Sequence, residues 1–157
     1  MTLFTDNATN DENYPPPQPI NTIPGISHPM ANIAYFEIPA DNVDRAKHFY
    51  HALLGWKIAP TKTPMEPAIV ASTNYQDITT GDAKEGTMNM GGMYKRQMGE
   101  PIINYVVVDD VDKILAKVEK LGGKIVRPKS EIPSVGVIAI IQDSEGNGIG
   151  LWKPAMM

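Results

Sequence analysis

One pattern occurs twice in this chain, and it restricts the possible folds more than any other feature. The first copy, from Ile33 to Ile58, reads IAYFEIPADNVDRAKHFYHALLGWKI; the second, from Ile103 to Ile125, reads INYVVVDDVDKILAKVEKLGGKI. Each copy starts with a strand-like run, continues with apolar residues at helical spacing and reaches glycine where the helix should end. Each copy therefore predicts a strand, a helix and a second strand, in that order.

A second pair of matching segments extends the repeat. VDR at 43–45 returns as VDK at 111–113, and GMYK at 92–95 returns as GLWK at 150–153. The two spacings differ because the middle loop of the first half is longer. We therefore predict an internal duplication, in which neither copy could bury its own sheet face alone.

Each half also contains candidate strands between its matching segments. In the first half they are AIVAST (68–73) and YQDITT (75–80), and in the second half VGVIAIIQD is followed by a SEGNG turn. We predict an α+β fold of tandem βαβββ modules, at about 31–96 and 101–154, within one domain that spans 31–157.

The first 30 residues differ in composition from the rest and are interpreted as a separate N-terminal arm. Residues 1–30 are rich in Pro, Asn and Thr, show neither strand nor helix periodicity, and contain the run PPP at 15–17. Consecutive prolines favour an extended chain without internal hydrogen bonds. The arm is either a loose segment outside the fold or one that wraps a partner subunit or covers a pocket. The second alternative would use its apolar residues as anchors, namely Leu3, Phe4, Tyr14 and Ile23.

Composition argues against several classes of function. A content of 42% hydrophobic and 20% charged residues is typical of a soluble globular domain. The formal net charge of −4, without a local cluster of Lys or Arg, argues against a nucleic-acid partner. The absence of cysteine excludes thiolate metal sites and thiol nucleophiles. With neither a signal-like N-terminus nor an apolar run of roughly 18 residues, we expect a cytoplasmic protein without a membrane partner.

Three segments, in their order along the chain, resemble a known family. FEIPADNVDRAKHFYHALLGW, DDVDKILAKVEKLGGKIV and QDSEGNGIGLWK are similar to the glyoxalase/bleomycin-resistance/dioxygenase group, the vicinal oxygen chelate superfamily. The resemblance covers about residues 31–154. It implies that each βαβββ module curls into half of a cup, with the helices outside. It also implies that many members hold a divalent metal in the cup, bound by His and Glu from the first and last strands of each module.

The positions of those metal ligands hold unsuitable residues in this chain. The resemblance places them at Tyr35 and Ile103 on the first strands and at Gly92 and Gly150 on the last strands. Glycine and isoleucine offer no coordinating side chain, and a neutral tyrosine is a poor lone ligand. We therefore expect no metal and no other cofactor.

Two further groups of side chains have a spacing that could suit a metal. His48 and His51 stand three residues apart on the predicted helix, where two rings can meet. We interpret both as solvated, because the apolar stripe of that helix is expected at Phe49, Tyr50 and Leu53. The methionines of MNM at 88–90 have no His or Cys nearby, and we interpret them as adaptable packing residues.

Strand alternation assigns side chains to the two faces of the sheet. On the first strand Phe36 and Ile38 are expected under the helix, so Tyr35 and Glu37 should face the cup. The glycines of the last strands would leave space in it for a ligand. The predicted ligand-binding residues are Tyr35, Met90, Gly92, Tyr94, Tyr105, Gly150 and Trp152, and Glu37 is the candidate catalytic residue.

We interpret the chain as a metal-free member of this group that binds a small, flat organic molecule in its cup. One alternative is a lyase-, isomerase- or hydrolase-type enzyme that uses Glu37 as general base. Another is a homo-oligomeric structural or regulatory domain whose cup is filled by its own side chains. An open pocket favours the first two functions and a filled one favours the third. Exposed sheet edges and an apolar arm also predict a homodimer.

Overall fold

The computed structural model describes residues 31–82 and 88–156. The N-terminal arm and its two alternative roles lie outside the described residues. The first module comprises β1 (Ile33–Ala40), α1 (Val43–Leu54), β2 (Lys57–Pro60), α2 (Pro67–Thr73), β3 (Gln76–Thr79) and β4 (Met90–Lys95). The second comprises β5 (Ile103–Val107), α3 (Val111–Val118), the short 3-10 helix η1 (Glu119–Leu121), β6 (Lys124–Ile132), β7 (Gly136–Gln142) and β8 (Gly148–Pro154). The predicted βαβββ order is therefore confirmed in both halves.

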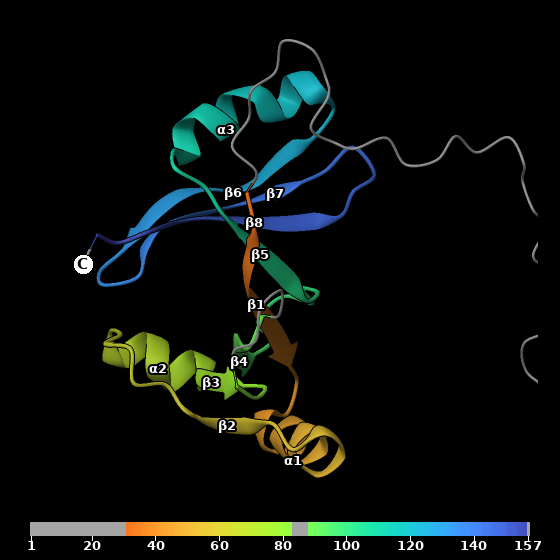
Figure 1. Cartoon of the computed structure of the whole chain (residues 1–157), viewed down its shortest axis with the longest axis vertical. Helices are drawn as coiled ribbons and strands as arrows, with labels where there is room; N and C mark the ends of the chain where they lie inside the picture. Colours follow the sequence, from red (N-terminus) through yellow and green to blue (C-terminus); the bar gives the residue numbers. More distant parts are fainter. Residues whose placement is uncertain (1–30, 83–87, 157) are drawn as a thin grey trace, which may run out of the picture. The chain divides into compact units, whose positions relative to one another are not determined.

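All these strands join in one curled, open sheet with the order β2-β3-β4-β1-β5-β8-β7-β6. The first strands of the two modules, β1 and β5, lie side by side at its centre and run antiparallel (Figure 1). Each is flanked on its other side by the last strand of its own module, β4 or β8, in parallel. The duplicated strands that carry the predicted site residues are therefore the four central ones.

Local sequence signals explain where the two longer helices begin. The side-chain oxygen of Asn42 accepts a hydrogen bond from the backbone N–H of Arg45 at 2.9 Å, and so caps α1. Asp110 caps α3 in the same way through the N–H of Lys113 at 3.1 Å. Gly55 ends α1 in the left-handed conformation (φ 70°), where glycine has no steric penalty. The glycine stop expected from the sequence is confirmed for α1.

Each long helix packs against its own half of the sheet and forms a separate core (Figure 1). The first core contains Phe36, Ile38, Ala40, Val43, Ile78 and Met93, with Ala46, Tyr50, Trp56 and Ile58 packed against it. The second contains Val108, Val111, Ala139 and Leu151, with Val106, Ile114, Leu115, Val137 and Ile141 packed against it. Phe36 and Ile38 thus lie under α1 as predicted. The opposite sheet face, which carries Tyr35, Glu37 and Tyr105, is called the cup face below.

One predicted strand is a helix in the structure. AIVAST (68–73) forms most of α2, which has Pro67 at its first turn and ends at Asn74 in the left-handed conformation (φ 45°). Its β-branched residues favour a strand locally. Proline at the first position of a helix needs no N–H partner, and the hydroxyl of Thr73 donates to the carbonyl of Ile69 at 2.7 Å. In the structure the segment is the connection between the antiparallel strands β2 and β3.

The buried face of α1 is narrower than the sequence pattern predicts. Tyr50 packs against the first core, but Phe49 and Leu53 are 56% and 65% exposed. The expected stripe is therefore wrong at two of its three positions, because α1 contacts the sheet mainly through Val43, Ala46 and Tyr50. Within residues 31–82 and 88–156, no helix is long and apolar enough to cross a membrane.

Candidate functional site

Glu37 is the centre of a hydrogen-bonded cluster on the cup face. Its Oε1 accepts a hydrogen bond from the hydroxyl of Tyr75 at 2.7 Å, and its Oε2 accepts one from Tyr105 at 2.8 Å. Glu37 and Tyr75 are half-buried and Tyr105 is buried. Both carboxylate oxygens therefore accept hydrogen bonds from phenols, one just before β3 and one on β5, and such bonds offset the loss of hydration of a half-buried carboxylate.

Aromatic rings surround this cluster. The hydroxyls of Tyr35 and Tyr75 lie 3.1 Å apart. The ring of Tyr35 makes an edge contact with Tyr105 (centroids 6.4 Å apart) and a tilted one with Trp152 (6.3 Å). Tyr94 stacks on Tyr75 with centroids 6.2 Å apart. Of the four predicted aromatics, Tyr35 thus contacts both Tyr105 and Trp152, and Tyr94 joins this group through Tyr75.

The phenols of the cup face hold their protons strongly. Burial raises the pKa of Tyr35 to about 12. Burial, and after it the charge of Glu37, also raises the pKa values of Tyr75, Tyr94 and Tyr105. A phenolate in this position would lose hydration and lie close to a carboxylate, and both effects favour the neutral form. At neutral pH these side chains are hydrogen-bond donors.

The glycines of the last strands do not leave empty space, contrary to our expectation. A Cβ on Gly92 would collide with the hydroxyl of Tyr75 and come within 2.9 Å of that of Tyr35. A Cβ on Gly150 would come within 2.5 Å of a ring carbon of Tyr105. The tyrosines occupy the volume that side chains at these positions would fill, so glycine is needed there for close approach.

The donors on the cup face do not fit the divalent-metal site that the family resemblance implies. Of the four ligand positions, Gly92 and Gly150 are packed against tyrosines and Ile103 is apolar. The fourth, Tyr35, keeps its proton because of its raised pKa. Among the described residues, no group of three or more His, Asp or Glu side chains is placed to hold a metal ion. One carboxylate among neutral phenols is a poor ligand set for Zn²⁺ or Ca²⁺.

The remaining predicted residues lie away from the hydrogen-bonded cluster. Met90 is at the start of β4 and is 58% exposed. His48 and His51 are exposed on α1, and Nδ1 of His51 lies 3.0 Å from the carbonyl oxygen of Trp56, which makes it the donor. Neither histidine belongs to the cup face.

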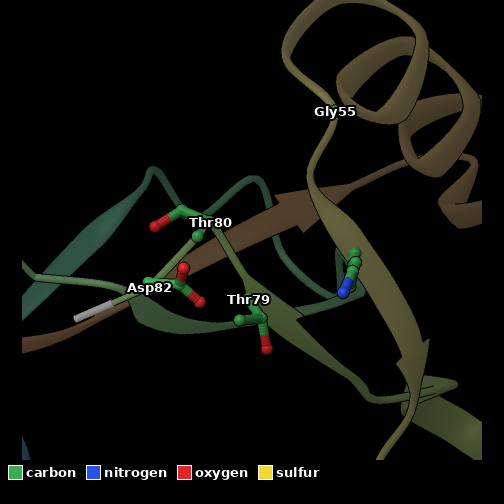
Figure 2. Close-up of a pocket in the computed structure, with 6 residues that line it drawn as sticks. Gly55, Thr79, Thr80 and Asp82 are labelled. Carbon is green, nitrogen blue, oxygen red and sulfur yellow. The ribbon is translucent and has the colours of Figure 1, made fainter.

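Two surface hollows border the first module outside the predicted site. One, of about 340 Å³, is lined by Lys47, His48, His51 and Ile58. The other, of about 90 Å³, lies between the end of α1 and the end of β3; Figure 2 shows Gly55, Thr79, Thr80 and Asp82 around it. The second is smaller than the roughly 300 Å³ typical of pockets for organic ligands.

Sequence reasoning missed Tyr75. The segment YQDITT predicted a strand, and Gln76 and Ile78 of that strand are buried on the helix face. Alternation then places Asp77 on the cup face, opposite Gly92, and Tyr75 two residues before it. Gly92 was the sequence signal that could have revealed Tyr75, because a glycine on one strand leaves room for a large side chain from the neighbouring strand.

Comparison with known proteins agrees with this architecture. Residues 32–151 match the model of the Glyoxalase/Bleomycin resistance protein/Dioxygenase superfamily. The chain is 36% identical over 123 residues to "Putative glyoxylase CFP32" of Mycobacterium tuberculosis, covering 76% of this chain and 42% of that protein. It is 23% identical over 133 residues to "Anthracycline biosynthesis protein DnrV" of Streptomyces peucetius, covering 79% of this chain and 47% of that protein. The chain thus spans less than half the length of these two relatives.

A solved structure shows the same fold at low identity. The methylmalonyl-CoA epimerase of Streptomyces coelicolor, in complex with 2-nitronate-propionyl-CoA, aligns with a TM-score of 0.56 and 17% identity. The alignment covers 79% of this chain and 97% of the epimerase. The family model covers most of the chain and agrees with the duplicated βαβββ order. The chain belongs to the Glyoxalase/Bleomycin resistance protein/Dioxygenase superfamily.

Proposed function

We propose that this protein binds a small, flat organic molecule on the cup face, without a metal or other cofactor. The observation that carries the proposal is the combination of four half-buried aromatic side chains with one carboxylate on a single sheet face. The aromatic residues are Tyr35, Tyr75, Tyr94 and Trp152, and the carboxylate is Glu37. Ligand sites for small organic molecules combine apolar walls with a few placed polar groups in this way.

The relatives support a small-molecule ligand without identifying it. One solved structure of this fold is an epimerase in complex with a CoA ester, and one relative is named for anthracycline biosynthesis. Both names concern small organic compounds. Because fold alone does not determine the ligand, the chemistry of the cup face has to define it.

Two other functions have less support. General-base catalysis by Glu37 would require its carboxylate to take a substrate proton while both of its oxygens already accept hydrogen bonds from Tyr75 and Tyr105. A purely structural role, with a cup filled by its own side chains, is favoured by the tyrosines packed on Gly92 and Gly150. The half-buried state of Tyr35, Tyr94 and Trp152 favours binding over a completely filled cup.

The two tryptophans provide an internal control for testing this proposal. Trp152 contacts Tyr35 on the cup face, whereas Trp56 stacks on Tyr50 in the first core. In ¹⁵N-labelled protein, a flat heteroaromatic compound that binds as proposed should shift the indole N–H signal of Trp152 and leave that of Trp56 unchanged. Zinc, nickel or manganese ions should shift neither signal and should not raise Tm. Heteroaromatic compounds that shift only the indole signal of Trp56, or a metal ion that binds stoichiometrically, would contradict the proposal.

We also propose that the protein is a homodimer. Within the described residues, α1 exposes three large apolar side chains, Phe49, Leu53 and Leu54, with exposed fractions of 56%, 65% and 51%. The strands β2 and β6 are the open edges of the sheet, and such edges favour pairing with another chain. Light scattering should show twice the chain mass at micromolar concentration, and a monomer would refute this assembly.

A further inference from the structure

We infer that the hydroxyl hydrogens of Tyr35, Tyr75 and Tyr105 all belong to one hydrogen-bond network that ends at Glu37, so that Tyr35 offers a ligand only an acceptor oxygen. The inference rests on the proposed function and specifies its ligand class. That class is flat molecules with an N–H or O–H donor or a protonated nitrogen. The number of hydroxyl hydrogens in the cluster determines this orientation.

The first step concerns the two phenols that contact Glu37. A carboxylate can only accept, and each phenol has a single hydroxyl hydrogen. Tyr75 donates to Oε1 at 2.7 Å and Tyr105 donates to Oε2 at 2.8 Å. The hydrogens of Tyr75 and Tyr105 are therefore both committed to Glu37.

The second step determines the direction of the Tyr35–Tyr75 contact. The two hydroxyl oxygens are 3.1 Å apart, and either could donate by distance alone. Because the hydrogen of Tyr75 is bound to Glu37, Tyr35 must be the donor and Tyr75 the acceptor. The network then runs from Tyr35 through Tyr75 to Glu37, and the oxygen of Tyr35 keeps lone pairs but no free hydrogen.

The third step concerns the other polar groups of the cup face. The indole N–H of Trp152 donates to the backbone carbonyl of Val135 at 2.9 Å, so it is also committed. The hydroxyl of Tyr94 lies near the carboxylate of Glu100. Asp77 adds a second negative charge near Tyr35. Arg127 on β6 adds a positive charge that acts on Tyr94 and Tyr105.

Together these contacts leave mainly acceptors for a ligand beside Tyr35. The free lone pairs of its hydroxyl accept hydrogen bonds, and the ring faces of Tyr35 and Trp152 carry partial negative charge. A ligand with a donor hydrogen gains a bond here. A ligand of the same shape with only an acceptor atom at that position meets another acceptor and is repelled.

The test compares indole with benzofuran, two flat molecules of nearly equal shape that differ in having an N–H donor or a ring oxygen. Binding is read from the Trp152 indole signal of ¹⁵N-labelled protein, with Trp56 as internal reference. We expect indole to bind about threefold to tenfold more tightly, as one neutral hydrogen bond contributes. Three variants locate the effect: Tyr35→Phe, Tyr75→Phe and, as matched control, Tyr50→Phe, whose ring packs against the first core and not on the cup face.

Tyr35→Phe removes the acceptor and should abolish the preference for indole. Tyr75→Phe removes the partner that orients the hydrogen of Tyr35, so that hydrogen can turn outward and the preference should fall or reverse. Tyr50→Phe removes a hydroxyl outside the cup face and should retain the preference. A cooperative thermal unfolding transition shows that each variant is folded. If either Tyr35→Phe or Tyr75→Phe does not fold, the result of the other variant tests the inference.

The outcomes separate this inference from the proposed function. Equal binding of indole and benzofuran at Trp152, tighter binding of benzofuran, or an unchanged preference in both Tyr35→Phe and Tyr75→Phe overturns the hydrogen orientation but leaves a ligand site. Failure of both compounds to shift Trp152 overturns the inference and counts against the ligand site as well.

Discussion

The two modules share a backbone plan but differ in chemistry at equivalent positions of the cup face. The register of the strands pairs Asp77 with Gly92 in the first module and Ile140 with Gly150 in the second. One position therefore holds an acid in one half and isoleucine in the other. The same comparison matches Glu37 with Tyr105, Tyr75 with Ile138, and Tyr94 with Trp152.

This difference indicates that the polar chemistry of the cup face belongs mainly to the first module. There, Glu37 and Tyr75 form a hydrogen bond within the module. The second module contributes the buried Tyr105 and Ile138, and one hydrogen bond across the β1–β5 junction, from Tyr105 to Glu37. The duplicated fold positions both sets alike, and later divergence of side chains can create an asymmetric site on a symmetric frame.

In both modules a glycine leaves room for a tyrosine, but a hydroxyl lies beside Gly92 and a ring lies beside Gly150. Substitution of these glycines should have the largest effect on stability. Gly92→Ala would collide with the hydroxyl of Tyr75, while Gly150→Ala would collide with ring carbons of Tyr105. Overpacking of this kind costs about 1–3 kcal/mol of unfolding free energy. Removal of a hydroxyl should therefore relieve the collision only in the first variant. In urea unfolding, the double variant Gly92→Ala/Tyr75→Phe should lose less free energy than the two single variants added together, whereas the losses of Gly150→Ala and Tyr105→Phe should be additive.

A control for this pair is Gly148→Ala, whose Cβ would meet only the flexible end of the Ile103 side chain at 2.8 Å. It should cost less than either of the other two. If Gly92→Ala is as stable as the wild type, Tyr75 can move away easily, and the packing described for the first module is wrong.

Alkaline pH should weaken the folded state through the phenols, three of which lie in the first module. The pKa of Tyr35 is raised from 10.0 to about 12. Below pH 10 both states keep the proton and stability is full; between pH 10 and 12 only the unfolded chain loses it, so stability falls. Tyr35 alone should account for about 2 kcal/mol of this loss.

Urea unfolding at intervals from pH 9 to pH 12 measures the effect. In Tyr35→Phe the unfolding free energy should decline less with pH, because the contribution of this one phenol is missing. A decline of equal steepness in the variant would show that Tyr35 titrates normally and is not buried in the cluster.

The hydroxyls of Tyr75 and Tyr105 test which module depends more on the Glu37 cluster. Tyr75→Phe removes a hydrogen bond to the carboxylate and also the acceptor of Tyr35, whereas Tyr105→Phe removes only one bond. A hydrogen bond to a charged group contributes about 1.5–3 kcal/mol, and the half-buried position of Tyr75 favours the lower value. We expect Tyr75→Phe to lower the unfolding free energy by about 1.5 kcal/mol or more, and by more than Tyr105→Phe does. The reverse order would place the centre of the cluster in the second module.

The smallest expected effect on stability concerns the N-terminal caps of α1 and α3. Asn42→Ala should cost about 1 kcal/mol, because it removes the side-chain acceptor for the N–H of Arg45. The backbone N–H of Lys113 lowers the pKa of Asp110, so its cap should weaken only when acid protonates that carboxylate. Amide hydrogen exchange during acidification measures the protection of each helix. Protection that falls first in α3 would support this difference, and identical acid sensitivity of α1 and α3 would contradict it.

Periodicity and parity predicted much of the site from local sequence. The alternation in IAYFEI correctly separated Phe36 and Ile38 under the helix from Tyr35 and Glu37 on the other face. Local rules were less reliable where an element has few neighbours. The β-branched AIVAST became α2, which starts at Pro67 and ends at the left-handed Asn74, and Phe49 remained exposed because α1 covers only a narrow part of the sheet.

The sequence by itself determined the duplication, the βαβββ order and the cup-face position of Glu37, because these depend on repeat spacing and on the periodicity of side chains along short segments. The tertiary structure alone decided the use of the space beside Gly92 and Gly150 and the partners of the carboxylate. Tyr75 reaches Glu37 from 38 residues away and Tyr105 from 68. Contacts at such separations depend on the register of paired strands and on the curl of the sheet, which no local pattern specifies.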